Sequence, residues 1–448
     1  MTNSNGKDSD VSDRRSLLVC FLIFVFVSVC VSLAVAMFYY RHEVRTNVFH
    51  LANFLGPVTY GLATTGKMVM FRSGPPYVGT VPFYGARMPF PVYLVFALSK
   101  VFGSKFLLIK LAKTLLLLIP LHVAVWISLA SSSQTKRAAV LCFVSLPFII
   151  PSFLLISTSL QVEEGYFYSF LAVAFALVIY ERQRLLPPWW AAIAFVCAVD
   201  LVYLTKSSMR LTCLCLIAAM LFRQSSRSMR IFTVAATMIA PIAWGSYLSS
   251  TSGRFSIGSS VDGFNFHKGN YPQFINRYPP IGDGNLDQWD GTLTASAPIH
   301  SEWEDNDDHM RQGLLFLHHP KALSRAFAAK VAVFFFSLED VGTGHRNDIY
   351  AKVSLVNMAM FRLLLLGAVV WSMANLIRRR ERFASLCFLS VVLATAAPYV
   401  IGFALTRHAT VLIFPSALAL AYYSSRDGAL HSRRTSATAN NPVHAGTG

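Results

Sequence analysis

The feature that most constrains this chain is the alternation of long apolar runs with short basic runs. Crossing the hydrocarbon core of a bilayer takes about 20 apolar residues in a helix. Only 14% of the residues are charged, against about 25% in soluble domains. The pattern predicts an all-α polytopic membrane protein of about ten transmembrane helices, the first of them an uncleaved signal anchor. The predicted spans lie near 16–39, 105–131, 138–153, 165–181, 188–205, 209–223, 230–249, 352–376, 383–403 and 409–424.

Two of these segments, 138–153 and 209–223, are short for a span, so each is interpreted as kinked or partly re-entrant. The apolar stretch ARMPFPVYLVFALSKVFG is also too short to cross a bilayer comfortably. A helix lying on the membrane surface suits it better.

The basic residues orient the predicted helices. The formal net charge is +17, but Lys and Arg lie mostly in short runs between apolar segments. This distribution is typical of membrane topology and argues against nucleic-acid binding. If the N-terminus is cytoplasmic, every strong basic run falls on the cytoplasmic side, as the positive-inside rule expects. Those runs are 136–137, 181–184, 223–230, 378–382 and the tail with Arg426, Arg433 and Arg434.

This predicted topology divides the chain into five parts, with both termini in the cytoplasm. The parts are a disordered N-terminus at 1–15, an N-terminal bundle at 16–249 with a first outer loop at 40–104, an outer region at 250–350 with an interfacial helix, C-terminal transmembrane helices at 351–424, and a disordered tail at 425–448. The outer region holds over half of the acidic residues together with Trp289 and Trp303, which predicts an ordered cap. The outer loops lack N-glycosylation sequons, which favours a bacterial inner membrane.

The order of several short motifs resembles one known class of enzyme. The first outer loop ends in R-x-P-x-P, a G-S turn precedes the second span, and an acidic residue opens the fourth. A later outer loop holds an aromatic-N-aromatic-x-x-G-N-x-P stretch, H-P precedes an interfacial helix, and an Arg enters the last span. Across 16–424 this order is similar to the GT-C glycosyltransferases that use polyprenyl-phosphate sugars. That group contains the protein O-mannosyltransferases and the ArnT-type transferases.

The resemblance implies a helical bundle with an extracytoplasmic active site. The enzyme would move a sugar from a polyprenyl-phosphate donor to a lipid, glycan or protein acceptor, by a single in-line displacement with inversion. A fixed cation suits such a site because it stabilises the phosphate leaving group. The expected phosphate-binding residues are Arg87, Arg407, Lys206 and Lys268. An alternative role for Arg87 and Arg407 is interfacial, with side chains that reach lipid headgroups.

The stretch GFNFHKGNYP at 263–272 is interpreted as a lid over the donor. Gly263 and Gly269 permit tight turns, rings offer faces for sugar stacking, and polar side chains supply hydrogen-bond donors. The donor-contacting residues expected here are Phe264, Asn265, His267 and Asn270, beside Lys268. The alternative is a turn-rich loop that packs its own aromatic rings.

The general base is where this sequence departs from the family. There, an Asp in the first outer loop lies several residues before a Tyr. The corresponding stretch, HLANFLGPVTYGLATTGK, contains no carboxylate, and Gly56 and Pro57 precede Tyr60. We therefore expect Glu164 or Glu163, in SLQVEEGYFY, to supply the base. An acidic residue at membrane depth is costly and often functional, although it also suits a helix N-terminus.

Two alternative functions remain open at the level of sequence. The chain could be a transporter or flippase of lipid-linked sugars, or a catalytically inactive relative that binds prenyl phosphate. The acidic run SEWEDNDDHM suggests a divalent metal, but it lacks the spacing of a calcium loop and is more typical of solvated charge at a helix N-terminus. No cofactor is therefore expected. The expected partners are a polyprenyl-phosphate sugar, an acceptor and membrane lipids.

Overall fold

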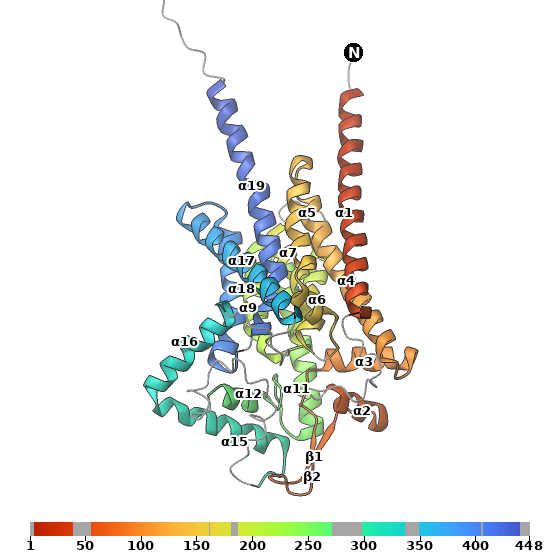
Figure 1. The fold of residues 1–448 in the computed structure, drawn as a ribbon, viewed down its shortest axis with the longest axis vertical. Helices are drawn as coiled ribbons and strands as arrows, with labels where there is room; N and C mark the ends of the chain where they lie inside the picture. Colours follow the sequence, from red (N-terminus) through yellow and green to blue (C-terminus); the bar gives the residue numbers. More distant parts are fainter. Residues whose placement is uncertain are drawn as a thin grey trace, which may run out of the picture.

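Long apolar helices form one end of the molecule and short elements form the other (Figure 1). The computed structural model describes residues 4–38, 55–160, 162–180, 187–270, 298–336, 349–404 and 406–439. Within these ranges, five helical segments are long and apolar enough to cross a membrane, which indicates a multi-pass membrane protein. They are Ser12–Met37, Phe106–Ala130, Arg227–Ser252, Met358–Ile377 and Arg382–Ile401.

Helix α7 (Glu164–Tyr180) is the centre of the bundle. It is apolar on every side, and all its residues except Phe170 are buried. A helix of this kind belongs inside a bundle because it has no polar face to present outward. It packs against α4, α8 and α19. The remaining bundle helices are α1 (Ser4–Phe38), α4 (Phe106–Ala130), α8 (Pro188–Tyr203), α9 (Arg210–Arg223), α10 (Arg227–Thr237), α11 (Ile239–Ser252), α17 (Ile349–Ile377), α18 (Arg382–Ile401) and α19 (Ile413–Ala439).

Proline decides where one predicted segment breaks. The segment 138–153 was expected to be kinked, and it divides into α5 (Arg137–Ser145), the 3₁₀ helix η4 (Leu146–Ile149) and α6 (Pro151–Thr158). Pro147 and Pro151 each lack a backbone N–H and so interrupt the helical hydrogen bonds. This kink is confirmed, whereas the segment 209–223 forms the uninterrupted helix α9.

The short elements lie at the end of the bundle opposite the N-terminus of α1 and the C-terminus of α19 (Figure 1). The antiparallel strands β1 and β2 pair Met70 with Phe83. Helix α3 covers the apolar stretch for which a surface helix is predicted, and it runs across the bundle (Figure 1). The elements of this end are α2 (Leu55–Thr65), β1 (Met70–Ser73), β2 (Thr80–Phe83), α3 (Pro89–Phe102), α12 (Asp262–Gly269), α15 (Glu302–Leu314), η7 (Leu315–His318) and α16 (Pro320–Phe336).

The structure differs from the sequence-based expectation in the outer region. Residues 263–269 form helix α12, not the expected turns. The glycines there allow close packing instead: a Cβ on Gly263 would lie 2.0 Å from the carbonyl oxygen of Asn306, and one on Gly269 would lie 1.8 Å from that of Gly402.

The acidic run SEWEDNDDHM, which forms the first part of α15, also differs from the expectation. Glu302, Asp305 and Asp308 are buried rather than solvated, because they occupy the face of α15 that packs against α12 and the β-hairpin. The termini differ too. Residues 4–15 and 425–439, for which the sequence predicts disorder, extend α1 and α19, since each added residue of a helix already nucleated gains a hydrogen bond. Trp289 lies outside the described residues.

Candidate functional site

Four charged side chains from three distant segments meet at the N-terminus of α7. Arg87 precedes α3, Glu163 and Glu164 open α7, and Lys206 lies between α8 and the 3₁₀ helix η6 (Ser207–Met209). Arg87 Nη1 lies 2.5 Å from Glu163 Oε1, and Lys206 Nζ lies 2.5 Å from Glu164 Oε1 and 3.5 Å from Glu163 Oε2. We refer to these four residues as the charge cluster. It combines the expected catalytic pair with two of the expected phosphate-binding residues.

Arg407 and His408 border the charge cluster from the 3₁₀ helix η8 (Thr406–Leu412). His408 Nε2 lies 3.8 Å from Glu164 Oε1, and the charge of Arg407 stabilises the same carboxylate electrostatically. Arg407 Nε is buried and has no hydrogen-bond partner among the described residues. The ring of His408 also stacks on Tyr399, with centroids 4.0 Å apart. Arg87 and Arg407 therefore face the same acidic pair from opposite ends of the sequence.

Burial and charge set the protonation of this site. Burial by itself lowers the pKa of Lys206, but the carboxylates of Glu164 and Glu163 outweigh it, so the net shift is upward and Lys206 is charged. Burial and the neighbouring ammonium of Lys206 together lower the pKa of His408 well below its usual range. His408 is then a neutral imidazole near pH 7. Three cations face two carboxylates, which leaves positive charge in excess.

The charge cluster is partly open to its surroundings. Glu164 has only 2% of its side chain exposed. Glu163, Arg87 and Lys206 have 20%, 18% and 14% exposed. Arg87, Lys206 and Glu163 are therefore partly exposed, whereas Glu164 is an internal anchor.

Three further residues contact the charge cluster or the segment that leads to it, and the sequence alone did not identify them. Lys113 of α4 donates to the carbonyl oxygens of Ser157 and Ser159, at 2.6 and 2.9 Å, and so holds the chain that leads to Glu163. Tyr399 accepts from Ser208 Oγ at 3.0 Å and places its ring 5.4 Å from Lys206 Nζ. The third is His408, which lies 3.8 Å from Glu164 and stacks on Tyr399. None of the three stands in a recognisable motif, so no pattern in the sequence marks them.

The residues of α12 lie in a different environment. His267 is buried and its Nδ1 lies 2.9 Å from Nδ1 of His309 on α15. Asn270 donates to the carbonyl oxygen of Ile401 at 3.0 Å and accepts from Lys330 at 2.9 Å. The ammonium of Lys268 lies 4.9 Å from the ring of Phe403. Phe264 stands edge-on to His309, and Asn265 is exposed. These side chains thus contact α15, α16, the end of α18 and the segment that follows it.

The described part of the first outer loop, 55–104, contains no carboxylate. Gly56, Pro57 and Tyr60 lie on α2, and the ring of Tyr60 is exposed. Within the described residues, no group of three or more His, Cys, Asp or Glu side chains is arranged to hold a metal ion.

Comparison with solved structures identifies the fold. The archaeal oligosaccharyltransferase AglB from Archaeoglobus fulgidus, solved with an inhibitory peptide and a dolichol-phosphate, matches 95% of this chain with a TM-score of 0.50 and 13% identity. The apo form of the Archaeoglobus fulgidus oligosaccharyltransferase matches 94% with the same TM-score and identity. ArnT from Cupriavidus metallidurans in the apo state matches 90%, with a TM-score of 0.38 and 13% identity, and this chain covers 76% of it.

This chain spans about half the length of the oligosaccharyltransferase, 52% of it in both structures. No protein-family model matches the sequence, and no curated protein is detectably similar to it. The resemblance to the GT-C glycosyltransferases is confirmed at the level of the fold.

Proposed function

We propose that this protein transfers a sugar from a polyprenyl-phosphate donor to an acceptor hydroxyl on the extracytoplasmic side of a membrane. The charge cluster is the observation that supports this most directly. It brings Arg87 and Lys206 together at one end of the apolar bundle, and the charge of neighbouring Arg407 acts on the same Glu164 carboxylate. A lipid phosphate has its charged group at the membrane surface and its tail in the bilayer.

The cations suit a phosphate in number and kind. Arg87 can offer two parallel hydrogen bonds to phosphate oxygens, and Lys206 adds a point charge. Arg407, whose Nε lacks a partner among the described residues, can turn toward the same ligand. Glu163 pairs with the group of Arg87 that a phosphate oxygen would bind.

Donor binding would then change the role of Glu163. The phosphate would bind Arg87 and also attract the ammonium of Lys206. Glu163 would then interact less with both cations and become a better proton acceptor. The acceptor oxygen forms a bond to the anomeric carbon while the bond from that carbon to the phosphate oxygen breaks. The electron pair goes to the phosphate, which the cations stabilise, and the hydroxyl proton goes to Glu163. Glu164 stays with Lys206 as the internal anchor.

The arrangement of the helices supports the proposed topology. The N-terminus of α1 and the C-terminus of α19 lie at one end of the molecule, while α12, α15 and the β-hairpin lie at the other (Figure 1). We propose about ten transmembrane helices with both termini in the cytoplasm, an outer cap that includes α12 and α15, and a location in a bacterial inner membrane.

Binding of undecaprenyl phosphate to the purified protein, followed by native mass spectrometry, tests the donor site. Arg87→Ala and Lys206→Met are expected to weaken binding. The control is Asp307→Asn, which changes an exposed carboxylate of α15 paired with Arg254 and should bind normally. Equal binding by all four proteins would refute the site.

Transfer is tested separately by mass analysis of glycolipids and glycoproteins in a deletion strain. Complementation with wild type should restore the missing glycan, and Glu163→Gln should not, because it keeps the shape of the side chain and removes its basicity. Lipid binding without any change in glycans would instead favour an inactive relative. The absence of a carboxylate from 55–88 is the observation that supports this second candidate.

A further inference from the structure

Helix α12 and the residues that flank it contact each of the three chain segments that carry the cations. Just before it, the backbone N–H of Ser260 donates to the carbonyl oxygen of Gly85 at 2.9 Å, two residues from Arg87. After it, Asn270 donates to the carbonyl oxygen of Ile401 at 3.0 Å, on the segment that leads to Arg407. The third contact, to the segment of Lys206, is made by the side chain of Asp262.

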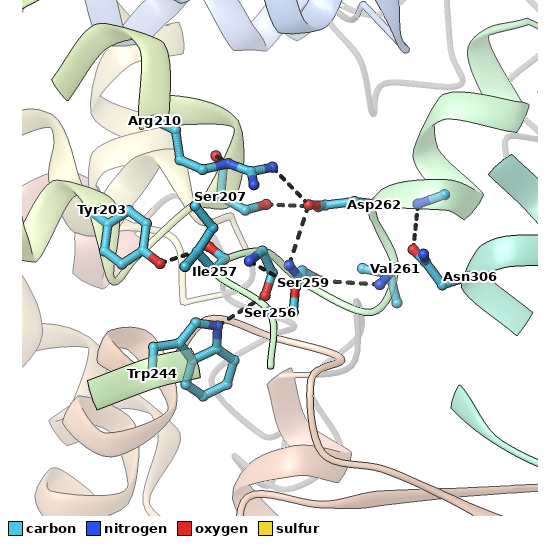
Figure 2. A network of polar contacts seen from close by, with 12 residues as sticks. Tyr203, Ser207, Arg210, Trp244, Ser256, Ile257, Ser259, Val261, Asp262 and Asn306 are labelled. Carbon is cyan, nitrogen blue, oxygen red and sulfur yellow. Dashed lines mark hydrogen bonds and ion pairs between the residues drawn. The ribbon is translucent and has the colours of Figure 1, made fainter. Parts of the chain in front are cut away.

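Asp262 holds the residues that directly follow Lys206 (Figure 2). Its Oδ1 accepts from Ser207 Oγ at 2.7 Å, and its Oδ2 accepts from Arg210 Nη2 at 3.0 Å. Arg210 also donates from Nε to the carbonyl oxygen of Ser207 at 2.8 Å. Hydrogen bonds thus connect the two ends of the 207–210 turn to each other and to Asp262, the first residue of α12.

Hydrogen bonds on two sides hold α12 in place. Figure 2 shows the preceding segment held by two side chains of the bundle, with Tyr203 donating to the carbonyl oxygen of Ile257 and Trp244 donating to that of Gly258, at 2.7 and 2.9 Å. On the other side, Gly263 N donates to Asn306 Oδ1 of α15 at 2.8 Å. Helix α15 adds a second tie to the Arg87 segment, because Glu302 Oε2 accepts from Gly85 N at 2.8 Å.

We propose that α12 is a clamp that aligns the three cation-bearing segments, and that Asp262 is the positioning residue through which it holds Lys206. This inference rests on the proposed function of the charge cluster as a phosphate site. Asp262 acts through Ser207 and Arg210 and need not touch the donor. Losing it should let the 207–210 turn relax and move the ammonium of Lys206 away from its place between Glu163 and Glu164.

A double-mutant cycle separates positioning from general stability. Asp262→Asn keeps an acceptor for Ser207 but presents an amide NH₂ to the guanidinium of Arg210. We expect it to weaken undecaprenyl phosphate binding by about 10-fold, as loss of a charge-assisted hydrogen bond does. Lys206→Met should then cost clearly less in the Asp262→Asn background than in wild type, because its contribution is already lost.

The matched control is Asp307→Asn, on the neighbouring helix α15. In that background Lys206→Met should keep its full effect. Asp262→Glu retains the charge and should recover part of the binding. The clamp is refuted if Asp262→Asn binds as wild type, or if its effect and that of Lys206→Met simply add.

Hydrogen exchange gives a readout that does not depend on the ligand. Asp262→Asn should speed exchange of the backbone amides between 205 and 210, and Asp307→Asn should not. If wild type binds no lipid phosphate while this local effect is present, the proposed function fails and the clamp stands. Unchanged exchange in Asp262→Asn overturns the clamp, whether or not lipid binds.

Discussion

Removing the charge of Glu164 should destabilise this protein far more than removing an exposed carboxylate. Glu164 is almost wholly buried, and its Oε1 lies 2.5 Å from Lys206 Nζ and 3.8 Å from His408 Nε2. Removing one partner of a buried ion pair costs about 3–5 kcal/mol, because the other charge is left buried and uncompensated. Glu163 remains 3.5 Å from Lys206, so we expect Glu164→Gln to cost about 3 kcal/mol, at the lower end of this range.

The assay is thermal unfolding of the purified protein in one detergent, with Asp307→Asn as the control. The pair between Asp307 and Arg254 is also short, at 2.7 Å, but both side chains are nearly half exposed. Exposed pairs contribute about 0–1 kcal/mol, so the control should unfold close to wild type. The double variant Glu164→Gln with Lys206→Met should recover much of the loss, since it removes the stranded ammonium as well.

Two results would refute this reasoning. If Glu164→Gln unfolds at the wild-type temperature, Lys206 is not held in a buried ion pair. If the double variant is less stable than Glu164→Gln alone, Lys206 is still stabilised in Glu164→Gln, by Glu163 or by another partner, and its charge is not left uncompensated.

Three further predictions concern the outer elements and the topology. Burial and His309 lower the pKa of His267 to about 4. As the pH falls, this histidine is therefore protonated in the unfolded chain before it is protonated in the folded protein. The folded state should lose stability below about pH 6.5, by about 1 kcal/mol at pH 5.5. Unfolding midpoints should show this slope weakened in His267→Gln, and an equal slope would contradict it. Gly263→Ala should lower the unfolding midpoint because its Cβ would meet the backbone of α15, whereas Gly367→Ala meets nothing within 4 Å and should be neutral or stabilising; equal midpoints would count against the packing. Asn265→Cys should react with a membrane-impermeant maleimide added to the outside of intact cells, and labelling only after permeabilisation would reverse the topology.

Much of the bundle follows from the sequence alone. In a bilayer the backbone must satisfy its own hydrogen bonds, so an apolar run of sufficient length becomes a helix whatever surrounds it. The proline pair in 138–153 interrupts a helix for an equally local reason. Glu163 and Glu164 could be selected because an ionisable group at membrane depth is costly and therefore informative. Arg87 and Lys206 could be selected because their positions resemble those of basic residues in the GT-C glycosyltransferases.

Tertiary structure decided how these residues combine. The sequence does not indicate that Glu163 pairs with Arg87 or that Glu164 pairs with Lys206, since each contact joins segments that are far apart in the chain. Asp262 illustrates the same limit. In the sequence it is one of many acidic residues in the outer region, and only the fold shows that it accepts hydrogen bonds from Ser207 and Arg210.

The stretch GFNFHKGNYP shows why local pattern was insufficient there. Glycine serves a turn when the backbone needs a positive φ, and it serves a helix contact when another backbone must approach closely. The sequence is the same in both cases. Only the approach of Asn306 to Gly263 and of Gly402 to Gly269 shows that these glycines serve packing. Close packing depends on two segments that the fold brings together, so the local sequence of either segment cannot reveal it.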